Sequence, residues 1–418
     1  MKIADAFAMV VPAERQVGFK AYDGSSVGLD GADVVMELKN PRGLQFIAGS
    51  PNQLGLARAY VSGDLEIHGN AYEALRRLYP LPLDHVSWSD RAKLAKEFAK
   101  PALARPTPPA QERQLKGGRH SKGRDAEAIE HHYDVSNRFY SWVLGPTMAY
   151  TCAVFTRPDA SLEEAQEEKF DLVCRKLDLK PGMRLLDVGC GWGGMVLHAV
   201  KHYGVTAIGA TLSKQQAQWA QQAISEQGLG DRAEVRYSDY RDVREDNFDA
   251  VSSIGLTEHI GRAQYASYFS FLQGKLRPGG RMLNHTITRP DNSEPSHYKR
   301  SFINRYVFPD GELSSPGLVM NAFNDAGFEI RHEENLREHY ALTLAQWCNN
   351  LEDNWDAAVA EAGLPTARVW RLYMAASRLG FELNTIQLHQ FLGVKLHDNG
   401  KADVPLRFDW TRRLPLGE

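Results

Sequence analysis

The sequence has few cysteines, no long apolar run and no strong excess of charge of either sign. Only four cysteines occur among 418 residues, and no two have the C-x-x-C spacing, so neither a disulfide scaffold nor a cysteine-based metal site is expected. No window holds about 18 uncharged apolar residues, and the N-terminus lacks the full plan of a signal peptide. These absences favour a cytoplasmic protein that, if it acts on a membrane, lies on the inner face. The formal net charge of −3 gives no reason to expect a nucleic-acid partner.

The length predicts more than one domain. A chain of 418 residues with 43% apolar and 24% charged residues is typical of two or three globular domains. Residues 1–100 are predicted to form a small α+β domain that associates with lipid. Its expected strands are 34–38 and 44–49, and its expected helices are 53–60 and 71–78.

Residues 101–124 are predicted to be a linker, because four prolines there oppose regular helix. Six basic residues against Glu112 leave a charge of +5. No aromatic residue is interleaved for base stacking, so the segment is interpreted either as a contact for anionic lipid headgroups, worth about 1 kcal/mol per basic residue, or as a solvated spacer. The basic residues are Arg105, Arg113, Lys116, Arg119, Lys122 and Arg124.

The segment 185–194 reads Leu-Leu-Asp-Val-Gly-Cys-Gly-Trp-Gly-Gly. It predicts a buried strand over 184–188, a tight loop, and a helix over 195–202. Glycines in such a loop let a ligand approach main-chain N–H groups at a helix start. No Gly-Lys-Ser/Thr follows and the spacing is not G-x-G-x-x-G, so the P-loop and dinucleotide patterns are excluded. The pattern resembles motif I of the Rossmann-like methyltransferases that bind S-adenosylmethionine (SAM); the alternative is a glycine-rich turn without a ligand.

Strands and helices alternate through the second half of the chain. This rhythm predicts an α/β domain over 125–418 with a mostly parallel, doubly wound sheet and a ligand at the carboxyl ends of the strands. A capping box at Ser161 and Glu164 predicts a helix up to Leu177, and residues 340–395 are expected to be a largely helical cap. The expected strands are 184–188, 206–210, 233–237, 250–253, 281–288 and 328–334.

Further motifs follow one another in a fixed order. Together with 187–193 they resemble the cyclopropane-fatty-acyl-phospholipid synthases, a family of SAM-dependent methyltransferases that act on unsaturated acyl chains. The resemblance is good from about residue 130 to the C-terminus and loose over 1–100. Family members that act on mycolic-type chains generally lack a sizeable N-terminal domain, so its presence favours membrane phospholipid as the acyl carrier. The motifs are 132–135 (His-Tyr-Asp-Val, in an aromatic stretch interpreted as a lid), 150–152 (Tyr-Thr-Cys), 209–216, 258–261 (Glu-His-Ile-Gly), 285–287 (His-Thr-Ile) and 306–309 (Tyr-Val-Phe-Pro).

The resemblance implies which residues bind SAM. The glycine loop would hold the cofactor, Tyr150 and Thr151 would close over its methionine end, and the next strand ends would face ribose and adenine. Asp239 is also favoured by its place after a predicted strand, where an acceptor can meet the amine of adenine; the alternative is a loop aspartate on the surface. The implied residues are Tyr150, Thr151, Gly189, Gly191, Gly193, Thr211, Gln216, Asp239 and Tyr240.

The resemblance also implies a bound bicarbonate as the catalytic base, held at Cys152 and by Glu258, His285 and Tyr340. A buried glutamate beside an anion is pushed towards its protonated form, which can donate a hydrogen bond. Read from the residues alone, Glu258 is equally compatible with a surface helix and His285 with a structural histidine of the core.

The implied reaction transfers the methyl of SAM to a cis double bond and leaves a carbocation, which needs a dry pocket with aromatic walls. Loss of a proton then gives a cyclopropane or a methylene-branched chain. Thr257 stands where family members commonly have an aromatic residue, so the choice of product stays open.

Two other functions stay open. A SAM-dependent methyltransferase of a small molecule or a protein would need neither a long apolar tunnel nor bicarbonate. A lipid-binding module with a decayed SAM site would not bind the cofactor. The expected partners are a phospholipid with an unsaturated acyl chain and an anionic membrane surface, with no nucleic acid; a homo-oligomer is not excluded.

Overall fold

The computed structural model describes most of the chain. The described residues are 1–81, 84–113, 124, 135–293, 295 and 301–411. They form two compact units.

The units are not continuous in sequence. The first contains residues 1–114 together with 298–309 and 351–379, and the second contains the rest of the chain. We predicted three continuous segments: a lipid-associating domain over 1–100, a linker over 101–124 and a catalytic domain over 125–418. The functions assigned to these segments stay predictions. Two late segments nevertheless pack within the first unit, which the composition of the chain did not indicate.

The first unit contains a four-stranded sheet in the order β2-β1-β3-β4. The predicted helices over 53–60 and 71–78 and the strand at 34–38 are confirmed. The strands are β1 (Gly18–Ala21), β2 (Ser26–Val27), β3 (Val35–Leu38) and β4 (Leu65–His68). The helices are α1 (Ile3–Val10), α2 (Pro41–Gly49), α3 (Gln53–Val61), α4 (Ala71–Leu78), α5 (Trp88–Ala102), α13 (Phe302–Tyr306), α16 (Trp355–Ala362) and, up to residue 379, α17 (Leu364–Glu382).

Two predictions for this part of the chain are wrong. Residues 44–49 are the end of α2, not a strand. Asn40 caps this helix by accepting from the N–H groups of Arg42 and Gly43, and Pro41 occupies the first turn, a combination that starts helices. The second wrong prediction is that Pro101 opposes regular helix, because helix α5 includes this residue. Pro101 lies close to the helix end, where a proline removes only one intrahelical hydrogen bond.

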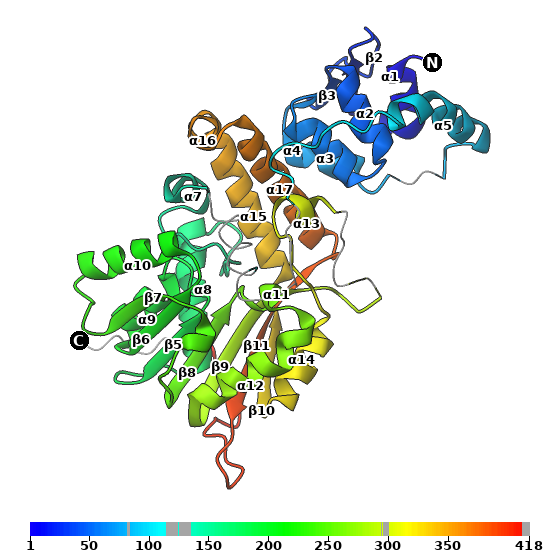
Figure 1. The fold of residues 1–418 in the computed structure, drawn as a ribbon. Helices are drawn as coiled ribbons and strands as arrows, with labels where there is room; N and C mark the ends of the chain where they lie inside the picture. Colours follow the sequence, from blue (N-terminus) through cyan, green and yellow to red (C-terminus); the bar gives the residue numbers. More distant parts are fainter. Residues whose placement is uncertain (82–83, 114–123, 125–134, 294, 296–300, 412–418) are drawn as a thin grey trace. The chain divides into compact units, whose positions relative to one another are not determined.

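The second unit is built on a seven-stranded sheet in the order β10-β11-β9-β8-β5-β6-β7 (Figure 1). Pairing is parallel from β9 through to β7 and antiparallel on both sides of β11. The predicted mostly parallel α/β fold is thus confirmed. The strands are β5 (Arg184–Val188), β6 (Thr206–Thr211), β7 (Ala233–Tyr237), β8 (Phe248–Ile254), β9 (Leu276–Thr288), β10 (Phe328–Asn335) and β11 (Gln387–Lys395).

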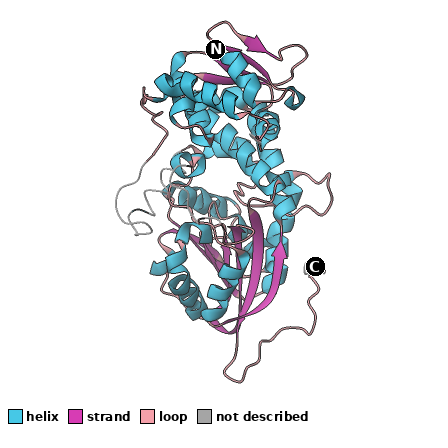
Figure 2. Ribbon diagram, turned by 90° about the vertical axis from the view of Figure 1, so that its right-hand side faces the viewer, coloured by secondary structure: helices cyan, strands magenta, loops and turns pink. Residues whose placement is uncertain are grey.

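Strand β11 was predicted as part of a helical cap, which is wrong. All but its two end residues are buried, so its sequence lacks the alternation that marks a strand with one solvent face. Figure 1 labels β11 beside β9 in this sheet, and Figure 2 draws all strands in magenta.

Helices cover both faces of this sheet. Leu185 packs into a cluster with α8, α9 and α10, whereas its neighbour Leu186 packs into another with α12 and α14, because successive side chains of a strand point to opposite faces. The predicted capping box of α8 is present at Ser161 and Glu164. The helices with residues in this unit are α7 (Asn137–Leu144), α8 (Leu162–Leu177), α9 (Gly194–Tyr203), α10 (Lys214–Glu226), α11 (Thr257–Ile260), α12 (Tyr265–Lys275), α14 (Pro316–Asp325), α15 (Arg337–Asp353) and α17 (Leu364–Glu382).

Within the described ranges, no helix is both long and apolar enough to cross a membrane.

Candidate functional site

The glycine loop lies where β5 ends and α9 begins. Gly189, Gly191 and Gly193 have φ of 70°, 54° and 80°, a region that favours glycine. A Cβ at Gly193 would lie 2.9 Å from that of Ala220, whereas a Cβ at Gly191 would meet nothing within 4 Å. Gly191 therefore faces open space, as a residue that lets a ligand approach the backbone must.

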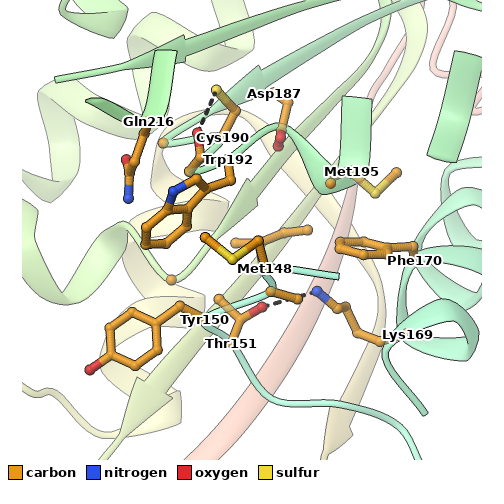
Figure 3. Close-up of a pocket in the computed structure, with 16 residues that line it drawn as sticks. Met148, Tyr150, Thr151, Lys169, Phe170, Asp187, Cys190, Trp192, Met195 and Gln216 are labelled. Carbon is orange, nitrogen blue, oxygen red and sulfur yellow. Dashed lines mark hydrogen bonds between the residues drawn. The ribbon is translucent and has the colours of Figure 1, made fainter. Parts of the chain in front are cut away.

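That space belongs to a pocket whose empty volume, including its open mouth, is about 550 Å³. Figure 3 shows Trp192 and Tyr150 at one side and Phe170 and Lys169 at the other. Five predicted cofactor residues line it, namely Tyr150, Thr151, Gly189, Gly191 and Gln216. The other lining residues are Met148, Ala149, Lys169, Phe170, Asp187, Cys190, Trp192, Gly194, Met195, Ile254 and Gly255.

The remaining predicted cofactor residues, Gly193, Thr211, Asp239 and Tyr240, are not among the lining residues. Thr211 donates from Oγ1 to Oε1 of Gln216 at 2.8 Å, which orients the Gln216 amide. The buried Asp239 carboxylate accepts two hydrogen bonds from the Arg241 guanidinium, at 2.7 and 2.5 Å. Tyr240 packs edge-on against the rings of Tyr268 and Phe271.

A buried lysine and a buried aspartate line the pocket as well, and we did not predict either as a site residue. Lys169 donates from Nζ to Thr151 Oγ1 at 3.0 Å (Figure 3), and Asp187 accepts from Ser252 Oγ at 2.6 Å. Burial lowers the pKa of Lys169 to about 7 and raises the pKa of Asp187 to about 7. The pocket thus contains one basic and one acidic side chain, and burial shifts each of them towards its neutral form.

Glu258 lies in the short helix α11, beyond the carboxyl end of β8, and is buried. Its carboxylate accepts from the Ile287 N–H and from Thr286 Oγ1, both at 3.0 Å. Burial raises the pKa of Glu258 despite these two hydrogen bonds. The surface-helix interpretation is therefore wrong.

His285 is buried in β9. Its Nδ1 lies 3.2 Å from Nε2 of Gln390, whereas its Nε2 has no hydrogen-bond partner among the described residues. Burial, together with the nearby ammonium groups of Lys169 and Lys176, holds the pKa of His285 well below its usual value. His285 is thus a neutral histidine with one unsatisfied nitrogen, which a purely structural core histidine rarely has.

Cys152 and Tyr340 are brought together by the start of α15. The Cys152 thiol lies 3.7 Å from the Leu336 carbonyl, which also accepts from the Tyr340 N–H at 3.1 Å. Burial raises the pKa of the Cys152 thiol, so the thiol is a poor nucleophile. The charge of Lys169 acts on both Cys152 and His285.

A row of aromatic rings leads from the cofactor pocket to Tyr340. Successive ring centroids are 4.8, 5.9, 5.4, 6.0 and 4.4 Å apart. Such contacts stabilise packing, and aromatic faces also tolerate positive charge. In order, the rings are those of Trp192, Tyr140, Tyr150, Trp347, Tyr340 and Phe381.

Comparison with known proteins identifies the family. The sequence pattern described as "Mycolic acid cyclopropane synthetase" matches residues 120–391, which is more than half of the chain. The chain belongs to this family. The predicted family and enzyme class, a SAM-dependent methyltransferase of the cyclopropane synthase type, are confirmed.

Members of this family resemble the chain over different lengths. A probable fatty acid methyltransferase of Mycobacterium tuberculosis is 54% identical over 408 residues, 95% of both chains. Another of Pseudomonas putida is 40% identical over 398 residues, 94% of both chains. The crystal structure of mycolic acid cyclopropane synthase CmaA1 complexed with SAH and CTAB has a TM-score of 0.60 and 34% identity, covering 64% of this chain and 97% of that chain. The cyclopropane synthase MmaA2 of M. tuberculosis has a TM-score of 0.61 and 33% identity over the same shares.

Thr257, the position at which the chain departs from the common cyclopropane synthase pattern, is fully buried. It donates from Oγ1 to Asn284 Oδ1 at 2.6 Å. Residues 131–134 of the predicted lid, and with them most of the motif at 132–135, lie outside the described residues. Among those described, no group of three or more His, Cys, Asp or Glu side chains is arranged to hold a metal.

Proposed function

We propose that this cyclopropane synthase family member transfers the methyl of SAM to the cis double bond of an unsaturated fatty acyl chain of membrane phospholipid. The single observation that carries the proposal is the row of aromatic rings from the cofactor pocket to Tyr340. The faces of such rings tolerate a developing positive charge. The relatives named as fatty acid methyltransferases support the acyl substrate.

Several features of the pocket suit SAM. Gly191 leaves room for a ligand at the backbone, and Gln216 is oriented by Thr211. The aromatic side chains of Tyr150 and Trp192 add apolar surface. When bound, SAM supplies an electrophilic methyl on a sulfonium.

The double bond donates its electron pair to this methyl, the C–S bond breaks, and its electrons stay on sulfur. The acyl chain is then a carbocation that must lose a proton. Loss from the new methyl closes a cyclopropane; loss after the charge has moved to the carbon that bears the methyl leaves a methylene branch. We propose bicarbonate as the base, held at Cys152 and by Glu258, His285 and Tyr340.

Features of the described residues support bicarbonate. His285 has an unsatisfied nitrogen in a buried place, and burial raises the pKa of Glu258, which favours the form that can donate to an anion. A small-molecule or protein substrate would need neither feature. We further propose that the enzyme works at an anionic membrane surface in the cytoplasm.

The purified chain, incubated with SAM and a phosphatidylglycerol that carries oleoyl chains, is expected to give fatty acids heavier by one methylene. Mass spectrometry of the released acids measures this gain, and fragmentation distinguishes a ring from a methylene branch. Removal of bicarbonate by degassing is expected to lower turnover, and added bicarbonate to restore it. No heavier acid from any unsaturated phospholipid would reject the acyl substrate, and full turnover without bicarbonate would reject the base.

A further inference from the structure

Three strands of the large sheet carry a row of polar side chains. The register pairs Glu334 of β10 with Gln390 of β11, and Gln390 with His285 of β9. Residues directly opposite one another on neighbouring strands point to the same face of a sheet. Gln390 and His285 are each 1% exposed, so bulk water does not satisfy their hydrogen-bonding groups.

Lys176 of α8 completes this row. Its ammonium donates to Oε1 of Gln390 at 2.7 Å and also contacts the Glu334 carboxylate. Burial lowers the pKa of Lys176, and the Glu334 carboxylate opposes this shift by stabilising the ammonium, which is a donor only. The Gln390 oxygen must therefore face Lys176, and its NH₂ group must face His285.

The NH₂ group of Gln390 lies 3.2 Å from Nδ1 of His285. Since an amide NH₂ is a donor only, Nδ1 must accept, and in a neutral imidazole the proton then sits on Nε2. Nε2 is the buried atom without a partner among the described residues.

We infer that Lys176 and Gln390 are positioning residues that fix His285 as the Nε2–H tautomer, so that it presents a hydrogen-bond donor to an anion or an oxygen of the reacting system. The direction of each hydrogen bond follows from the one before it, starting at the ammonium. The inference rests on the proposed function only in placing His285 at the reaction centre.

The tautomer is measured directly by NMR of the chain labelled with ¹⁵N-histidine, with the His285→Gln variant assigning the signal. In the wild-type protein we expect protonated Nε2 and unprotonated Nδ1. A proton on Nδ1 would overturn the inference, and this measurement needs no other variant to fold.

The Gln390→Glu variant tests the relay. Its carboxylate still accepts from Lys176 but also offers an acceptor to Nδ1, so we expect the proton to move to Nδ1. We expect kcat to fall by at least about tenfold, with SAH binding by calorimetry unchanged. An unchanged tautomer, or a moved proton with unchanged kcat, would reject the positioning role.

Gln387→Glu is the matched control, because it adds the same charge to the same strand. The Gln387 side chain contacts His389 and Asn384, so we expect the His285 signal and kcat to match the wild type. If wild-type protein methylates no acyl chain, the proposed function fails, whereas the tautomer is still established by the NMR signal.

Discussion

Glu258 combines two hydrogen bonds that favour its ionised form with a burial that opposes it. Burial is the larger effect, and the pKa is raised. A carboxyl that stays protonated to higher pH can donate to a bound anion, which an ionised carboxylate cannot. The protonation state of this one side chain therefore decides how an anion is held.

Replacing Glu258 by alanine is expected to lower kcat by about 10²-fold or more, while glutamine, which mimics the protonated carboxyl, retains more activity. Because the pKa is raised, the protonated form is lost as pH rises through it, so wild-type kcat should fall on the alkaline side. The Gln variant should lack this fall. Steady-state rates across pH, with SAH affinity by calorimetry, measure both effects.

Glu312→Gln is the control for this prediction. Its carboxylate accepts from the Arg262 N–H in the loop after α11, so it removes a nearby charge without touching the Glu258 carboxyl. We expect its pH profile to match the wild type. Full turnover of Glu258→Ala would remove Glu258 from the reaction.

At the residue scale, motif patterns indicated Glu258 and His285 but not their surroundings. Whether a glutamate is buried depends on the tertiary packing around it, which the local sequence does not determine. Lys169 and Lys176 were missed although a signal was present. Both lie seven residues apart on the apolar face of α8, where a lysine is costly unless it has a partner.

At the scale of elements, the strand–loop–helix unit around the glycine loop was predictable because glycine spacing and apolar length are local signals. Helix α2 and strand β11 were not. The apolar residues of α2 favoured a strand, although the Asn40 cap and Pro41 before them are signals of a helix start. The burial of β11 on both faces is a product of tertiary packing and leaves no alternation to read.

Gly191→Val is expected to abolish cofactor binding with only a modest loss of stability. A side chain at φ 54° costs about 1 kcal/mol and meets no protein atom within 4 Å, but it fills the space where a ligand approaches. Calorimetry with SAH should show affinity lower by at least about tenfold, and thermal unfolding a shift of a few degrees.

Gly182→Val is the matched control. Gly182 also has a positive φ, 84°, and open space around its Cβ, but it lies in the turn before β5 and does not line the pocket. It should lose similar stability and keep SAH affinity. Equal affinity in both variants would mean that Gly191 does not face the cofactor.

At the scale of the whole molecule, composition predicted several domains but not that residues 298–309 and 351–379 join the first unit. Such long-range assembly has no local signature. The basic residues of 101–124 do not all have the same role. Arg124 forms an ion pair with Asp310 at 2.5 Å, so its charge stabilises the fold. Lys116, Arg119 and Lys122 lie outside the described residues.

Helix α5 of the first unit is a second candidate for the predicted contact with anionic lipid. Trp88 at the start of α5 is 84% exposed and Leu103, just after its end, is 78% exposed, with Lys93, Lys96 and Lys100 exposed between them. Exposed apolar side chains beside lysines are typical of helices that lie in a membrane interface. We expect the double variant Trp88→Ala, Leu103→Ala to bind phosphatidylglycerol vesicles several-fold more weakly in co-sedimentation.

Leu406→Ala controls for the loss of any exposed apolar residue, because Leu406 lies fully exposed in the second unit. It should bind vesicles like the wild type. Since salt screens the attraction of lysines to lipid headgroups, wild-type binding should weaken at high ionic strength. The double variant has lost the apolar part of its contact, so its residual binding should fall more steeply with salt than that of the wild type. Undiminished vesicle binding by the double variant would exclude α5 as the lipid contact and leave the basic segment before residue 124 as the one to mutate.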